Sequence, residues 1–136
     1  MSGFLPLAEI KSRVRALARA VDAPESCLPT FDSRQDGLFV ESDAAYHLAY
    51  VEPGRGPEWR KTTLDIDELL YWIFEGATFK MACAFELKHR IETEDFRRQL
   101  FKHQLELMGR IDSRWQVRLE SDLNEVLRKN PFNDTL

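Results

Sequence analysis

The sequence is poor in the features that mark secreted, membrane-spanning or disulfide-rich proteins. Only two of its 136 residues are cysteines, which favours free thiols over a disulfide framework. No apolar run reaches the roughly 18 residues that a membrane-spanning helix needs. The N-terminus, MSGFLPLAEIKSR, lacks the basic start, apolar core and small-residue cleavage site of a secretory signal. These absences predict a protein that stays in the cytoplasm.

Excess charge is also missing. The chain has 19 basic and 23 acidic residues, a net charge of −4. Nucleic-acid binding requires a basic stripe, so we predict neither a nucleic-acid nor a membrane partner. A weakly acidic protein is compatible with a basic protein partner. With 43% hydrophobic residues, the chain is apolar enough to form one folded domain over residues 1–136.

Catalytic motifs are absent from the sequence, and neither a catalytic residue nor a cofactor is predicted. Cys83 and His89 are six residues apart on one predicted helix, about 9 Å along its axis and too far for a hydrogen bond. Glu86 and His89 form an E-x-x-H pair, the spacing that di-iron bundles use, but nothing else completes the ligand set. A metal-dependent enzyme built on Glu86 and His89 remains an alternative hypothesis.

A long helix over residues 65–91 is the element around which we expect the rest to pack. Asp65 can cap its start, Glu68 stands in the capping-box position and Asp67 adds favourable charge to the first turn. Gly76 is its weak point, either a kink or a close helix crossing. The predicted inner face consists of Ile66, Leu70, Ile73, Ala77, Met81 and Ala84.

Before this helix, the pattern predicts one helix and a small sheet. Apolar residues at helical spacing indicate a helix over 5–21, and a loop rich in turn formers follows it. Residues 37–63 change to a period of two, interrupted by Ser42-Asp43 and by the segment PGRGP. This pattern predicts a three-stranded antiparallel meander.

After the long helix, two antiparallel helices are predicted over 93–108 and 113–129. Thr93 is placed at the start of the first, Gly109 at its end, and Ser113 at the start of the second. The predicted fold class is therefore α+β, with an N-terminal helix, a β-meander, the long helix and two further helices. The corner between the long helix and the next is densely charged. Its charges either form ion pairs that lock the corner or face a partner.

Six residues near the start of the long helix are candidates for contact with a protein partner. The acidic ones have two interpretations: they complement the positive helix end, or they form a negative patch that steers a basic partner. Trp and Tyr are frequent interface anchors, although most of the aromatics here are expected in the core. The candidates are Trp59, Asp65, Asp67, Glu68, Tyr71 and Glu75.

The tracts DELLYWIF, FELKHRIE, DFRRQLF and QLELMG resemble the immunity protein 63 family of bacterial polymorphic toxin systems. YVEPGRGPEWRKTT, the Trp of SRW and the closing NPFND add to a resemblance that covers about residues 46–133. The resemblance implies a protein that binds and neutralises a cognate toxin domain without catalysis. It carries no catalytic residues, and it does not specify the toxin.

The interpretation that follows is a cytoplasmic immunity protein that blocks a toxin domain by covering its active site. The alternative is a small regulatory or scaffold module that uses the long helix to form a homodimer. The sequence leaves open whether the protein is a monomer or a homodimer.

Overall fold

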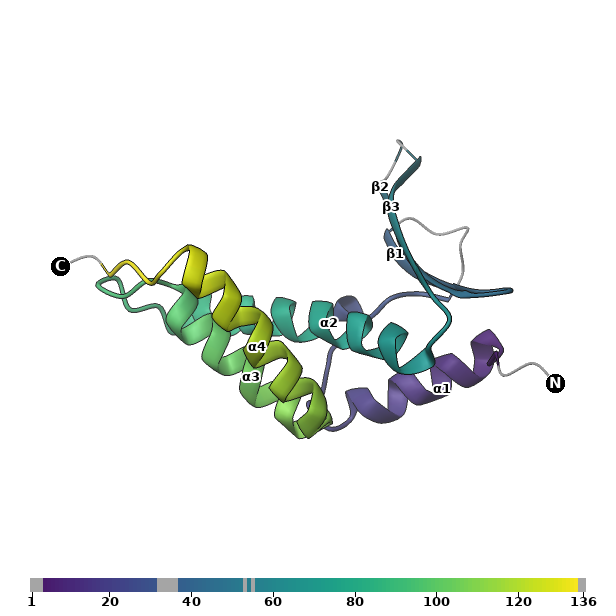
Figure 1. Ribbon diagram of the computed structural model, residues 1–136, viewed down its shortest axis with the longest axis horizontal. Coiled ribbons are helices and arrows are strands. Elements are labelled where there is room, and N and C mark those ends of the chain that lie inside the picture. The colour runs from purple at the N-terminus through teal and green to yellow at the C-terminus, as the bar shows by residue number, and fades with distance from the viewer. Residues whose placement is uncertain (1–3, 32–36, 53, 55, 135–136) are drawn as a thin grey trace. The chain divides into compact units, whose positions relative to one another are not determined.

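The computed structural model describes residues 4–31, 37–52, 54 and 56–134 (Figure 1). It confirms the predicted α+β class, with one helix, then a three-stranded antiparallel sheet, then three helices. The elements are α1 (Leu7–Ala18), the 3-10 helix η1 (Glu25–Cys27), β1 (Gly37–Ser42), β2 (Tyr46–Glu52), β3 (Gly56–Thr63), α2 (Ile66–Lys88), α3 (Arg97–Ile111) and α4 (Ser113–Lys129). No helix of the described part is long and apolar enough to cross a membrane.

The chain forms two compact units, Met1–Phe74 and Glu75–Leu136. The first contains α1, the sheet and the first turns of α2. The second contains the rest of α2 with α3 and α4. Each unit is described by itself below.

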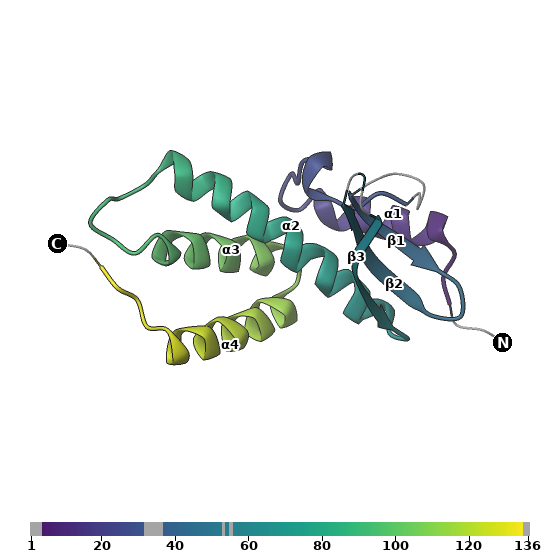
Figure 2. The same cartoon turned by 90° about the horizontal axis from the view of Figure 1, so that it is seen from above.

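In the first unit, the sheet lies over α1 and the beginning of α2 (Figures 1 and 2). The strand order is β1-β2-β3, so β3 forms one edge of the sheet as described. At the other edge Thr30 forms a parallel bridge with Phe39 of β1. The segment before α1 is attached to the sheet through Leu5, whose N–H donates to the Tyr46 hydroxyl at 2.8 Å. The Leu5 carbonyl accepts a hydrogen bond from Ser42 Oγ at 2.8 Å.

The helix predicted over 5–21 is shorter in the structure, Leu7–Ala18. Pro6 occupies the N-cap position, so the first helical residue is Leu7. At the other end, the Ala23 N–H donates to the Ala18 carbonyl at 3.1 Å, and Asp22 has a φ of +52°. This left-handed residue ends the helix and redirects the chain. Residues 32–36 of the predicted loop, and Pro53 and Arg55 of the predicted PGRGP turn, lie outside the described residues.

The long helix begins where the capping residue predicts. Asp65 Oδ1 accepts a hydrogen bond from the Asp67 N–H at 3.0 Å, so Asp65 satisfies an N–H of the first turn. The helix continues through Gly76, and a Cβ added there would meet no atom within 4 Å. The described residues therefore contain no close crossing at this glycine.

The predicted inner face of this helix is only partly correct. Ile73 and Ala77 are buried as expected, but Ala84 is exposed. Leu69 and Phe74, which the prediction left off that face, are fully buried. A helix that is apolar nearly all round gives no single period from which its buried side can be read.

In the second unit, α3 and α4 pack as an antiparallel pair beside the second part of α2 (Figure 2). Gln104 of α3 is buried and its amide has partners on α2: Nε2 donates to the Glu75 carbonyl at 3.1 Å and to Thr78 Oγ1 at 3.3 Å. A buried polar group must find such partners to avoid a desolvation cost. The buried residues of α3 and α4 are Leu100, Gln104, Leu107, Met108, Trp115 and Leu119.

The predicted ends of these helices need correction. The first begins at Arg97 rather than Thr93, because the Asp95 carboxylate accepts from the Arg97 N–H at 3.0 Å. It continues past Gly109 to Ile111. The last helix spans Ser113–Lys129 as predicted, but its cap is Asp112, whose Oδ1 accepts from the Arg114 N–H at 2.8 Å. In both cases an aspartate accepts from the N–H two residues later.

The charged corner between α2 and α3 is held by ion pairs, as one of its two interpretations predicted. Asp95 binds the Arg97 guanidinium and also accepts from the Asn133 N–H at 2.9 Å. Arg98 binds the Asp134 carboxylate at 2.9 Å. Both arginines lie over the Phe132 ring. Together these contacts bind residues 130–134 to the beginning of α3.

We expect acid to weaken the second unit through this carboxylate cluster. Hydrogen bonds from the Arg97 side chain, and then from the Arg97 and Asn133 N–H groups, hold the pKa of Asp95 well below its usual range. The Arg98 side chain and the Asp95 N–H lower the pKa of Asp134. A carboxylate with a depressed pKa stabilises the folded state above its unfolded pKa, about 4. That contribution is lost as the pH falls below this value.

Urea unfolding between pH 7 and pH 3 measures this effect. Asp95→Asn should lower the urea midpoint at pH 7 and reduce its fall toward pH 3. Glu120→Gln, at an exposed position of α4, is the matched control and should follow the unmodified protein. An Asp95→Asn protein that loses stability in acid as steeply as the parent would contradict the role of this cluster.

Candidate protein-binding surface

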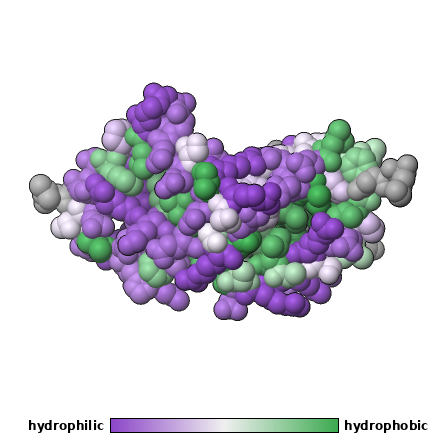
Figure 3. Space-filling view, turned by 60° about the horizontal axis from the view of Figure 1, so that its bottom comes forward, coloured by the Kyte–Doolittle hydropathy of each residue, from purple (hydrophilic) through white to green (hydrophobic). Residues whose placement is uncertain are grey.

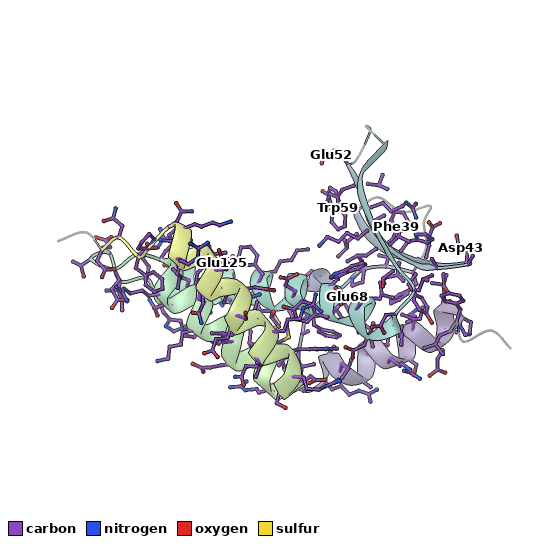
Figure 4. The ribbon with its side chains drawn as sticks, in the orientation of Figure 1. Phe39, Asp43, Glu52, Trp59, Glu68 and Glu125 are labelled. Atoms are coloured by element: carbon purple, nitrogen blue, oxygen red, sulfur yellow. The ribbon has the colours of Figure 1, made fainter. Side chains whose placement is uncertain are left out.

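A stacked aromatic pair with one exposed member lies on the face of the sheet near its β3 edge. Trp59 of β3 is directly opposite Tyr50 of β2 in the antiparallel register. Their rings are stacked, with centroids 6.4 Å apart and an interplanar angle of 16°. Trp59 keeps 41% of its surface exposed, which is high for a residue that normally packs inside. Figure 4 shows its position on the sheet.

This aromatic surface continues onto α2. Lys61, two residues after Trp59, lies on the same face because side chains alternate along a strand. Its Nζ is 5.4 Å from the ring centroid of Trp72, a cation–π contact. Glu68 precedes Trp72 by one helical turn and therefore lies on the same side of α2. We call Tyr50, Trp59, Lys61, Glu68 and Trp72 the β3–α2 strip.

The acidic candidates lie at the start of α2, next to this strip. Asp65 is exposed, and Asp67 and Glu68 are half-buried. One oxygen of Asp65 caps the helix, which supports the structural interpretation for that residue. Asp67 and Glu68 add negative charge to the first turn. The capping function of Asp65 and an acidic surface beside Trp59 are compatible, because a carboxylate has two oxygens.

The structure separates the other two candidates from this strip. Tyr71 is 1% exposed, so its ring is a core residue in this structure. Glu75 begins the second unit, where its side chain is half-buried and its carbonyl accepts from Gln104. The structure thus brings Trp59 and Glu68 into one strip with Asp65 and Asp67 beside it, and leaves Tyr71 and Glu75 out.

Three residues of the strip were missed by the sequence reasoning. Trp72, not Tyr71, is the aromatic of this turn with exposed surface, and the i, i+4 spacing from Glu68 could have indicated it. Tyr50 and Lys61 follow from the strand register: once β2 and β3 pair across the PGRGP segment, Tyr50 is opposite Trp59. The register was not determined by the pattern alone, because a bulge at Tyr50/Val51 shifts it.

The residues of the metal hypothesis are engaged in other contacts. Glu86 is buried, and both of its oxygens accept from the Arg90 guanidinium, at 2.8 and 3.0 Å. The Arg90 hydrogen bonds lower the pKa of Glu86. Burial, and then the Glu86 charge, raise the pKa of the Cys83 thiol, which disfavours a reactive thiolate. Within the described residues, no three His, Cys, Asp or Glu side chains are grouped as metal ligands.

The geometry thus describes a surface with one exposed tryptophan, two half-buried aromatic rings and a glutamate on the same side of α2. Most of the face seen in Figure 3 is hydrophilic, with smaller hydrophobic areas between. Residues 42–125, more than half of the chain, match the family described as immunity protein 63. The chain belongs to this family, and its family class is that of an immunity protein.

The family match confirms the resemblance expected from the sequence tracts and covers β2, β3, α2, α3 and most of α4. It ends before the NPFND tract, which supplies the tail bound at the start of α3. Comparisons with curated proteins and with solved structures gave no match.

Proposed function

We propose that this protein is a cytoplasmic immunity protein that binds and neutralises a cognate toxin domain without catalysis. The β3–α2 strip is the contact surface, and it covers the active site of the toxin. The exposed Trp59, stacked on Tyr50, is the observation that carries the proposal. A large aromatic with a rigid neighbour loses little conformational freedom on binding, which is why such residues dominate many interfaces.

The acidic residues at the start of α2 supply steering and specificity. Glu68 belongs to the strip, and Asp65 and Asp67 precede it at the beginning of the helix. Charges at the rim of an interface mainly raise the association rate, and they do so more strongly at low salt. The toxin partner is therefore expected to carry a basic surface around its active site.

Co-expression with the toxin domain encoded immediately beside the gene tests this proposal. We expect the protein to restore growth and to form a complex with the purified toxin domain. Asp67→Lys with Glu68→Lys should slow association about tenfold at low salt, and less at high salt. The control Glu120→Lys with Asp122→Lys makes the same charge change at exposed positions of α4, and it should leave association unchanged.

The outcomes separate function from surface. A folded protein that neither binds the toxin domain nor restores growth would contradict the proposed function. Rescue that both double variants retain, with equal association rates, would keep the function and contradict the acidic surface.

Homodimer formation through α2 is the second candidate, and one observation favours it. In the second unit, Phe79 and Leu87 are 47% and 67% exposed on α2. They follow Gly76, which has open space beside it, so a second helix could approach this side closely. Light scattering distinguishes the candidates: a mass of twice 15.9 kDa without any toxin would favour the homodimer, and 15.9 kDa would exclude it.

A further inference from the structure

Three basic side chains follow one side of α1. Lys11, Arg15 and Arg19 are spaced four residues apart, and all three are exposed. No carboxylate of the described residues pairs with any of them. Arg13, on the same helix, does have such a partner, because its Nε is 3.3 Å from Glu9 Oε2. We call Lys11, Arg15 and Arg19 the α1 ridge.

Ion pairing does not account for the α1 ridge, although Arg15 in the last turn complements the negative end of the helix. Like charges four residues apart on a helix repel one another, whereas an opposite pair such as Glu9–Arg13 is favourable. The protein is acidic overall, with a net charge of −4, so three cations without a carboxylate partner among the described residues are a local reversal of its charge. Charged surfaces of this kind attract partners of the opposite sign.

A hollow of mixed polar and apolar lining opens beside the α1 ridge. Its volume is about 320 Å³, its apolar lining includes Val14, Leu28 and Phe31, and its charged lining consists of Lys11, Arg15 and Glu25. Arg15 also lines two neighbouring hollows of about 380 and 400 Å³ along α1. The first hollow is large enough to hold one apolar side chain of a partner. Charged residues of the partner next to that side chain would then lie within reach of the α1 ridge.

We propose that the α1 ridge and this hollow form a second docking surface, which binds an acidic segment of a protein partner. Carboxylates of that segment pair with Lys11, Arg15 and Arg19, and one apolar side chain enters the hollow. This surface is distinct from the β3–α2 strip, whose neighbours are acidic, and it does not depend on the toxin proposal.

A polypeptide fits this surface better than nucleic acid does. Nucleic-acid affinity depends on many basic contacts over a wide surface, whereas the ridge is one helix side long. Val14, Leu28 and Phe31 in the first hollow suit a side chain such as leucine rather than a phosphate.

The test is a titration of the full chain with a short synthetic peptide of glutamates around one leucine, followed by amide chemical shifts. We expect shifts to concentrate in residues 11–19 and 28–31. Arg15→Glu should weaken the apparent affinity at least about threefold, since it replaces an attraction by a repulsion. Lys80→Glu makes the same charge change at an exposed position of α2, and it should leave the affinity unchanged. The same peptide with lysines in place of glutamates should produce no shifts there.

Several results would overturn the proposal. The acidic peptide could cause no chemical-shift changes, or it could cause them away from these residues. The parent and Arg15→Glu could also bind the peptide with equal affinity. A stronger response of the same residues to oligothymidylate, or to vesicles containing an anionic lipid, would assign the ridge to that class of ligand instead. A protein that neutralises its toxin but ignores the peptide would refute this inference alone.

Discussion

Replacing Trp59 by alanine is expected to weaken toxin binding about 30-fold or more, because central aromatic anchors typically contribute about 2 kcal/mol or more. The loss should appear mainly as faster dissociation. Stability should change little, because Trp59 is 41% exposed and its main neighbour, Tyr50, remains on the same sheet face. Surface plasmon resonance against the toxin domain measures the dissociation rate, and urea unfolding measures stability.

Phe96→Ala is the matched control for this variant. Phe96 is also an aromatic and 52% exposed, but it lies in the second unit at the start of α3. It should bind the toxin as the parent does. Equal affinities of Trp59→Ala and the parent would show that the β3–α2 strip is not the contact surface. Equal losses in both variants would indicate a nonspecific hydrophobic contribution.

Replacing Phe74 by alanine is expected to have the largest effect on stability. Phe74 is fully buried, and truncating a buried phenylalanine typically costs about 3–5 kcal/mol from lost burial and the cavity that remains. This is a large part of the roughly 5–15 kcal/mol that holds a small protein folded. Urea unfolding should show a lower midpoint. Phe96→Ala, the same substitution at an exposed position, should change stability by less than about 0.5 kcal/mol.

The same experiment tests which side of α2 is buried, because the predicted inner face of this helix did not include Phe74. If Phe74→Ala were as stable as Phe96→Ala, the described burial of this helix side would be wrong. A large loss would confirm that the core is built around a side of the helix that hydrophobic spacing alone did not distinguish.

The order and type of the elements could be predicted from the sequence, because each has a clear period. The strands alternate every two residues, the helices repeat every three to four, and Asp65 gives a direct start signal. Helix ends were less predictable. Asp112 caps the last helix and the Asp95 carboxylate accepts from the first N–H of the helix before it, whereas Thr93 and Ser113 looked equally suitable in the sequence. Which of two neighbouring polar residues caps a helix depends on backbone geometry, which the sequence does not display.

The candidate surface was predictable only in part. Trp59 and Glu68 were identified because a tryptophan on a strand and an acid in a first helical turn are visible in the sequence. Tyr71, also named as a candidate, is buried in the structure. Two adjacent aromatics on a helix point in different directions, and only the fold determines which is covered. The α1 ridge was not among the candidates, because the hollow beside it is lined by a separate loop segment as well as by α1.

The position of β3 at the edge of the sheet also has a consequence for aggregation. An edge strand presents N–H and C=O groups that can pair with another chain and start an ordered aggregate. The sequence of β3 opposes this outcome: Pro57 removes one donor, and Arg60 and Lys61 place charge along the strand. The register shift between Trp59 and Pro57 also interrupts the regular ladder. The strand that carries Trp59 can therefore remain uncovered in the cell without acting as a template for misassembly.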